Sequence, residues 1–318
     1  MNNPINISVE SDIYDLKKYS DLTRPISDHA LIRVEFNDFV IYSYNLLNGD
    51  DKIAFSFTLR RFTETKKNKY NRDLDDTLTE FFYKTNLQRT KDICDILLRK
   101  QEDKPIIFCF QEVGERMEAI IREKFQEIYD ILSSEIDVVG SRSGELIPKH
   151  EKRLTLVPKT GVEHTYDKYK IEANGLNEIF HKEKPYKSAI GVNIFGCYII
   201  NIHVNWQSSF DQLLQFLEEV KSIPNLIIIG DANTSLDDIS GYLKDNDLNV
   251  VKPDRQTFIS KMILPGGTKY NQSNIVDQVI YNIRVEELVE TTPVETTPVE
   301  TTPVLVGGSK QYFIKYNI

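Results

Sequence analysis

The sequence has too few cysteines for a disulfide framework, and it places them singly. The three cysteines, Cys94, Cys109 and Cys197, lie far apart in apolar or helical surroundings. Their odd number and wide spacing exclude both a disulfide-stapled fold and a cysteine-ligated metal site. Unpaired cysteines are typical of a reducing compartment, so we expect an intracellular protein, cytoplasmic or nuclear.

The chain also lacks a long hydrophobic run. No stretch approaches the roughly 20 consecutive apolar residues that a membrane-spanning helix needs. The first residues, MNNPINISVESD, contain no basic region followed by an apolar segment. We therefore expect neither a membrane span nor a signal peptide.

Positive charge is in deficit. Lys and Arg number 39 against 48 Asp and Glu, which gives a formal net charge of -9. This balance excludes a protein that coats nucleic acid through a general positive field. Any phosphate-bearing substrate must be bound locally, by a metal ion or by a small basic patch.

What the chain does have is a regular alternation of apolar segments. Hydrophobic residues make up 40% of its 318 residues, enough to bury a substantial core. Runs rich in Val, Ile, Phe and Tyr predict β-strands at 30–36, 39–46, 106–110, 189–195, 197–202, 226–230 and 276–283. Apolar residues at intervals of three to four predict helices at 75–100, 115–133 and 209–221. The fold class is therefore mixed α/β.

Other segments are predicted to lie outside the core. Residues 60–72 and 141–187 are polar and rich in lysine, and we interpret them as solvated insertions. Residues 289–304 repeat the unit VETTP three times, which predicts a flexible linker. We expect one domain over residues 1–288, then this linker, and a tail at 305–318 whose alternating pattern is compatible with an edge strand.

Polar side chains follow three of the predicted strands at the point where each strand ends. They are Glu112 after IIFCF, His203 and Asn205 after YIIN, and Asp231 and Asn233 after LIIIG. Asp277 interrupts the apolar run IVDQVIY, and a carboxylate inside a strand needs a partner. Each residue alone has an ordinary explanation as a turn, a helix-start acid or a hydrogen-bonded histidine. Together they form the set that phosphate chemistry requires: oxygen ligands for a hard cation, a base, and donors.

The first two predicted strands are separated only by residues 37–38, Asn-Asp. Two turn-forming residues predict a tight β-hairpin. With the strands paired across this turn, Asp28 and Asn45 become diagonal neighbours on one face, about 7 Å apart at Cα. That separation allows both to share one cation. His29, next to Asp28, arrives at the same rim.

These motifs together resemble the signature of one family. They are SDH (27–29), YSYN ending at Asn45, QE ending at Glu112, NIHVN (201–205), GDAN (230–233) and VDQVIY (276–281). The set is similar to the endonuclease/exonuclease/phosphatase superfamily, the DNase I-like proteins. There SDH usually comes last, whereas here it comes first and the other motifs keep their order. The chain thus resembles a circularly permuted member over roughly residues 25–285. The implied fold is a four-layer α/β/β/α sandwich of two mixed β-sheets.

The resemblance implies a role for each matching residue. Glu112, Asn45 and Asp28 would bind or orient Mg²⁺, for which Mn²⁺ is a possible substitute. Asp231 would position and deprotonate the attacking water. The remaining residues would act on the phosphate. Asn233 would hold it, and His29 would stabilise its developing negative charge, with Asp277 fixing the tautomer of the His29 imidazole. His203 and Asn205 would be further phosphate contacts.

The sequence therefore predicts a metal-dependent phosphodiesterase or nuclease that attacks phosphorus with water. Its expected substrate is DNA or RNA: the lysines of 60–72 slightly favour nucleic acid, while the net acidity slightly disfavours long nonspecific duplexes. Two alternatives stay open. One is a phosphatase acting on an inositol phosphate or another small phosphate ester, and the other is a non-catalytic interaction module that retains the fold. The sequence leaves the oligomeric state open as well.

Overall fold

The computed structural model describes ten segments of the chain, and they contain most of the strands that were predicted. The described residues are 6–10, 29–46, 76–140, 146–159, 163–172, 186–204, 209–253, 258–263, 269–274 and 277–282. All of them belong to one compact unit, Met1–Val285. The predicted insertion at 60–72, the linker at 289–304 and the tail at 305–318 lie outside the described residues.

One mixed sheet has six strands. Their order is β1 (Asn6–Glu10), β2 (Leu31–Glu35), β3 (Val40–Asn45), β4 (Ile106–Val113), β8 (Lys152–Pro158) and β5 (Tyr129–Ser133). β3 and β4 run parallel, and the other neighbours are antiparallel. Because β3 and β4 run parallel, their carboxyl ends meet at one edge of this sheet.

The second mixed sheet has eight strands. Its order is β13 (Asn249–Val251), β16 (Asp277–Tyr281), β12 (Leu226–Asp231), β11 (Cys197–His203), β10 (Tyr186–Ile194), β6 (Asp137–Gly140) and β7 (Leu146–Lys149), with β9 (Thr165–Glu172) also paired to β10. Here β11 and β12 are the parallel pair. A separate hairpin is formed by β14 (Phe258–Ile263) and β15 (Lys269–Asn274).

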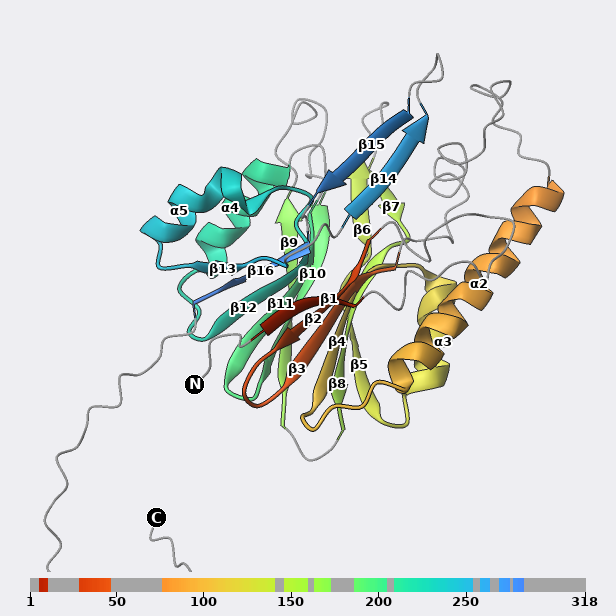
Figure 1. Ribbon diagram of the computed structural model, residues 1–318, viewed down its shortest axis with the longest axis horizontal. Helices are drawn as coiled ribbons and strands as arrows, with labels where there is room; N and C mark the ends of the chain where they lie inside the picture. The colour runs from red at the N-terminus through yellow and green to blue at the C-terminus, as the bar shows by residue number, and fades with distance from the viewer. Residues whose placement is uncertain are drawn as a thin grey trace, which may run out of the picture. The chain divides into compact units, whose positions relative to one another are not determined.

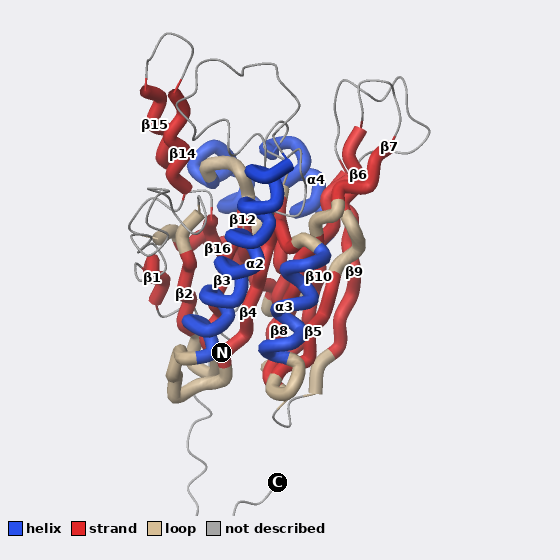
Figure 2. The backbone as a smooth tube through the Cα atoms, turned by 90° about the vertical axis from the view of Figure 1, so that its right-hand side faces the viewer, coloured by secondary structure: helices blue, strands red, loops and turns tan. Residues whose placement is uncertain are grey.

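The sheets pack face to face and helices cover their outer faces (Figures 1 and 2). Successive side chains along each strand point to opposite faces of the sheet, which gives each sheet an inner and an outer apolar face. Ile41, for example, points into the core between the sheets, while its neighbour Tyr42 packs beneath the helices. The helices are α2 (Asp76–Leu98) and α3 (Glu115–Phe125) on the six-stranded sheet, and α4 (Ser209–Val220), the 3₁₀ turn η3 (Leu236–Ile239) and α5 (Ser240–Asp245) on the other. The predicted α/β/β/α sandwich is confirmed. No helix within the described segments is long and apolar enough to cross a membrane.

The predicted β2–β3 hairpin is present with the expected register. Ile32 lies opposite Ser43, and the Phe36 amide donates to the Phe39 carbonyl at 2.9 Å across the turn. This register directs position 30 toward Asn45 at the open end of the hairpin. The order of the motifs along the chain still predicts a circular permutation, and that prediction stays untested.

Two sequence predictions were wrong. The predicted helix at 115–133 ends at Phe125, and Tyr129–Ser133 forms β5 instead, because its backbone pairs with β8. The segment 141–187 is not all solvated: β9 is mostly exposed, but β8 is buried between β4 and β5. The charges of β8 obscured this, because Lys152 and Arg153 find carboxylate partners far away in the sequence.

We predict that Gly230→Ala destabilises the protein. Gly230 adopts a φ of +130° in β12, and a Cβ there would lie 2.2 Å from the backbone oxygen of Ile202. Strained backbone and overpacking each cost about 1–3 kcal/mol. Urea denaturation should therefore show a free energy of unfolding lower by about 2–6 kcal/mol.

Gly241→Ala is the matched control for this substitution. Gly241 is exposed in α5 and has open space where the Cβ would stand. Alanine is the better helix former, so this variant should be at least as stable as the wild type. Equal stability of the two variants would contradict the packing described for Gly230.

Candidate active site

The polar residues predicted from the strand ends meet at one edge of the sandwich. Asn45 and Glu112 come from the parallel strands β3 and β4, while His203 and Asp231 end the parallel strands β11 and β12. β16 runs antiparallel to β12, so that its first residue, Asp277, lies directly opposite Asp231. The hairpins β6–β7 and β14–β15 project beyond this edge (Figures 1 and 2).

Asn45 connects the two sheets at the site. It is fully buried, and its Nδ2 donates to Asp231 Oδ2 at 3.0 Å and to Glu112 Oε1 at 3.3 Å. Glu112 itself has a φ of +52°, and the pairing of β4 with β8 shifts register around it. A bulge of this kind re-aims a side chain. Glu112 is in fact one-fifth exposed, whereas Asp231 is almost completely buried.

Asp231 is fixed by its neighbour two residues on. The Asn233 amide donates to Asp231 Oδ1 at 2.8 Å, and Asn233 Nδ2 reaches Asp231 Oδ2 at 3.2 Å and the Val204 carbonyl at 2.8 Å. Asn233 has a φ of +51°, a conformation that asparagine tolerates better than most residues. Burial raises the pKa of Asp231 to about 7; the His29 imidazole opposes this rise, and the charges of Asp277 and Glu112 add to it.

His29 lies between two carboxylates. Its Nδ1 is 2.9 Å from Asp277 Oδ2, and its Nε2 is 3.4 Å from Asp231 Oδ2. A carboxylate on one ring nitrogen fixes the tautomer and the ring orientation. Asp277 therefore aims His29 Nε2 toward the centre of the site.

His203 closes the site on the side of Glu112. Its Nε2 is 3.4 Å from Glu112 Oε1 and 3.7 Å from Asp231 Oδ2. Burial, together with the nearby positive charges of Lys187, Arg153 and Lys149, lowers its pKa well below the usual value. Within the described part of the chain its Nδ1 has no hydrogen-bond partner. The lowered pKa favours the neutral form of the His203 imidazole, and its Nδ1 is buried.

The structure brings most of the predicted site residues together. Those that meet are His29, Asn45, Glu112, His203, Asp231, Asn233 and Asp277. Asp28, predicted as a metal ligand, and Asn205, predicted as a phosphate contact, lie outside the described residues.

Sequence reasoning missed the polar layer beneath these residues. Gln111 Nε2 donates to Ser43 Oγ at 3.1 Å and to Asn201 Oδ1 at 2.8 Å. Asn201 in turn donates to the Leu154 carbonyl at 3.0 Å, which links the two sheets. Both amides stand inside apolar strands, and such a position is the signal that could have found them.

The donor set suits a hard divalent cation. Glu112, His203 and Asp231 offer ligand atoms that all lie within 4.8 Å of one another, and the Asn45 amide is adjacent. Carboxylate oxygens are ligands that Mg²⁺ and Mn²⁺ prefer, and Asn45 orients both carboxylates through its Nδ2. Glu112, the more exposed carboxylate, is the natural anchor.

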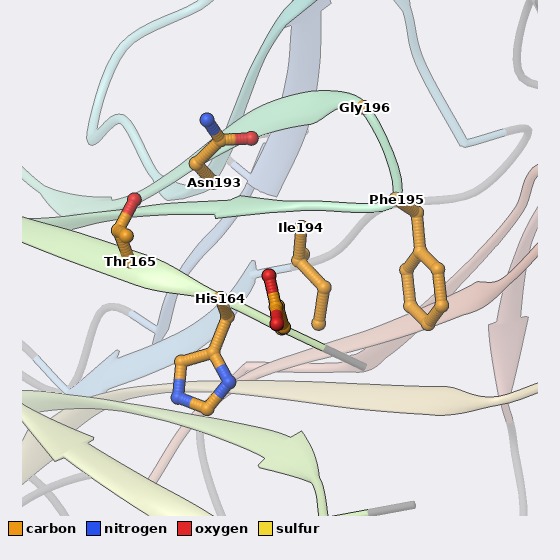
Figure 3. A pocket seen from close by; sticks show the side chains of 7 residues that line it. His164, Thr165, Asn193, Ile194, Phe195 and Gly196 are labelled. Carbon is orange, nitrogen blue, oxygen red and sulfur yellow. The ribbon is translucent and has the colours of Figure 1, made fainter. Parts of the chain in front are cut away.

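A separate cavity of about 590 Å³ lies at the carboxyl end of β10, away from the candidate site. Its lining includes His164, Asn193 and Phe195, shown in Figure 3, and none of the residues described above. The candidate site is therefore defined by its convergent polar groups and not by a cavity.

Comparison with known proteins finds no matching family model and no matching curated protein. Several solved structures are similar. An endonuclease/exonuclease/phosphatase family protein from Bacteroides thetaiotaomicron is 14% identical, with 76% of this chain and 80% of that chain covered and a TM-score of 0.44. An endonuclease/exonuclease/phosphatase from Bacteroides vulgatus is 14% identical, with 66% of this chain and 82% of that chain covered and a TM-score of 0.42. The structure of D. rerio TDP2 complexed with single strand DNA product is 17% identical, with 62% of this chain and 77% of that chain covered and a TM-score of 0.41. Two of the three bear the name of the family that the motifs resemble.

We predict that Glu112→Gln weakens Mg²⁺ binding. The substitution removes the accessible charged ligand but keeps its size, so affinity should fall at least about tenfold in titration calorimetry. Glu115→Gln is the matched control, because Glu115 is an exposed acid three residues away at the start of α3. Wild-type affinity in Glu112→Gln would contradict the assignment of Glu112 as a ligand.

Proposed function

We propose that this protein is a Mg²⁺-dependent phosphoester hydrolase that acts as a nuclease or phosphodiesterase on DNA or RNA. The observation that carries the proposal is the position of buried Asp231, which touches Asn45, Asn233 and His29 at one edge of the sandwich while Glu112 stays accessible beside it. A base, a donor and a metal ligand thus face one point, as in-line attack on phosphorus requires.

The metal would be held by Glu112, with Asn45 orienting this carboxylate through its Nδ2. Asp28, which precedes His29 in the sequence, is the further ligand that the motif implies. When bound, the cation neutralises charge on a phosphate oxygen. Mn²⁺ shares the oxygen preference of Mg²⁺ and is the natural substitute.

Asp231 would act as the general base. A base works best when its pKa lies near the operating pH, and burial raises the pKa of Asp231 to about 7. Two hydrogen bonds from Asn233 hold the carboxylate in one orientation. A water molecule in contact with Asp231 would therefore lose its proton as it attacks the phosphorus.

The histidines would stabilise the negative charge that develops on the phosphate. His29, held by Asp277, would donate from Nε2 to a phosphate oxygen. His203 would contribute as a neutral donor, because burial and the nearby cations disfavour its protonated form. Asn233, and Asn205 just beyond β11, are the proposed amide contacts to the same phosphate.

We predict that Asp231→Asn and His29→Ala each lower hydrolysis at least about a hundredfold while the fold is retained. The assay is a panel of labelled DNA, RNA and inositol phosphates with Mg²⁺ and with EDTA. Asp245→Asn is the control, since Asp245 lies in α5 and is exposed.

Each result of this panel is informative. Turnover of inositol phosphates alone would favour the small-substrate phosphatase, and inertness of the wild type on every substrate would favour a non-catalytic module. Near wild-type turnover by Asp231→Asn would remove Asp231 as the base.

A further inference from the structure

Five charged residues form an ordered chain beside His203. Arg153 Nη1 contacts Asp137 Oδ1, and Lys187 Nζ lies 2.9 Å from Asp137 Oδ2. The same Lys187 Nζ is 3.3 Å from Glu151 Oε2, and Lys149 Nζ is 2.6 Å from Glu151 Oε1. The charges thus alternate from Arg153 to Lys149, and we call this group the charge chain.

The charge chain borders the candidate active site. Asp137, Glu151 and His203 offer atoms that lie within 4.8 Å of one another. Arg153 Nη2 also donates to the His203 carbonyl at 3.2 Å. Since His203 contacts Glu112 through Nε2, the charge chain and the proposed metal ligands lie on either side of one imidazole.

The members of the charge chain differ sharply in exposure. The side chains of Arg153 and Asp137 are inaccessible and that of Glu151 is 1% exposed, whereas that of Lys149 is 27% exposed. The inner residues pair with one another as ions, and the lysine at the end of β7 is the member that solvent or a ligand can reach.

The charge chain holds three cations and two anions. Its one surplus positive charge is carried at the accessible end, by Lys149, which also feels the negative charges of Glu151 and Glu112. Once Glu112 holds a divalent cation, this wall of the site becomes more positive still. The group is therefore suited to bind an anion, and its interleaved cations disfavour a second metal.

We propose that Lys149 binds a substrate phosphate next to the scissile one on a nucleic acid strand. This rests on the proposed function. Lys149 has three N–H donors, and within the described residues its ion pair with Glu151 engages one of them, so the others can reach a phosphate oxygen. The buried part of the charge chain fixes the position of Glu151 and, through it, of Lys149. In a protein of net charge -9, one local cation of this kind matters for affinity.

The test measures binding of a fluorescently labelled single-stranded oligonucleotide by anisotropy over a range of salt concentrations. The full-length chain carries Asp231→Asn to prevent cleavage, and Mg²⁺ is held constant. In this background, Lys149→Gln should weaken binding and reduce the slope of log K against log salt by about 0.7, as expected for the loss of one phosphate contact. Lys149→Arg keeps the charge and should keep the slope.

Lys124→Gln is the matched control. Lys124 is also partly exposed and also bonds a carboxylate, with its Nζ 2.7 Å from Asp95 Oδ1, but it lies on α3. Lys124→Gln should therefore bind the oligonucleotide with the same affinity and salt dependence as the parent. Lys149→Gln should fold, because Glu151 keeps Lys187 as a partner; thermal unfolding checks this, and Lys149→Ala is the second variant.

An unchanged slope in Lys149→Gln, an equal loss in Lys124→Gln, or no oligonucleotide binding by the parent would each overturn the proposal. A kinetic arm with Asp231 restored separates this outcome from failure of the proposed function. There, Lys149→Gln should raise the KM for an oligonucleotide but not for bis(4-nitrophenyl) phosphate, which has a single phosphate. If the wild type hydrolyses neither substrate, the proposed function fails, and the binding result still decides the role of Lys149.

Discussion

The burial of Asp231 is the constraint on which the site depends. A carboxylate that is 1% exposed loses its hydration and must be stabilised by partners inside the protein. Here the partners come from separate elements: Asn45 from β3, Asn233 from the turn after β12, and His29 from a position two residues before β2. Strand pairing places Asn45, and the end of β12 places Asp231 and the turn with Asn233, so the sheets and the chemistry of the site are specified together.

The interior changes from apolar to polar along the strands toward this edge. In β4, the inward positions Ile107 and Cys109 belong to the core, and the next, Gln111, donates to Ser43 and Asn201 instead. Arg153 serves the same purpose nearer the edge, where it joins β8 of one sheet to the His203 carbonyl of the other. Directional bonds across the interface hold the sheets in one relative position, which apolar packing alone specifies less strictly.

The parts of the structure that were predictable from sequence depend on short-range geometry. The two-residue turn fixed the β2–β3 register, and the polar residues that end β4, β11 and β12 marked the site edge. The charge chain was not predictable, because Asp137 and Arg153 pair only after β6 and β8 have joined different sheets. In the sequence alone, Arg153 is indistinguishable from a surface charge, and for that reason the sequence wrongly predicts a solvated segment at β8. Likewise, nothing local in the sequence shows that three cations surround His203.

The short connection between β2 and β3 affects which strands that carry site residues are neighbours in the sequence. His29 and Asn45 are brought together by a tight hairpin, whereas His29 and Asp277 are 248 residues apart in sequence and meet through a 2.9 Å contact. In a chain that joined the Asp277 strand directly to the His29 strand, His29 would be near Asp277 in sequence and far from Asn45. Loop-closure entropy grows only slowly with length, so either connection can form the same buried contacts. The motif order predicts such a permutation, and the hairpin gives it a physical basis, since side-chain pairing at the edge depends on strand register rather than on which strand comes first.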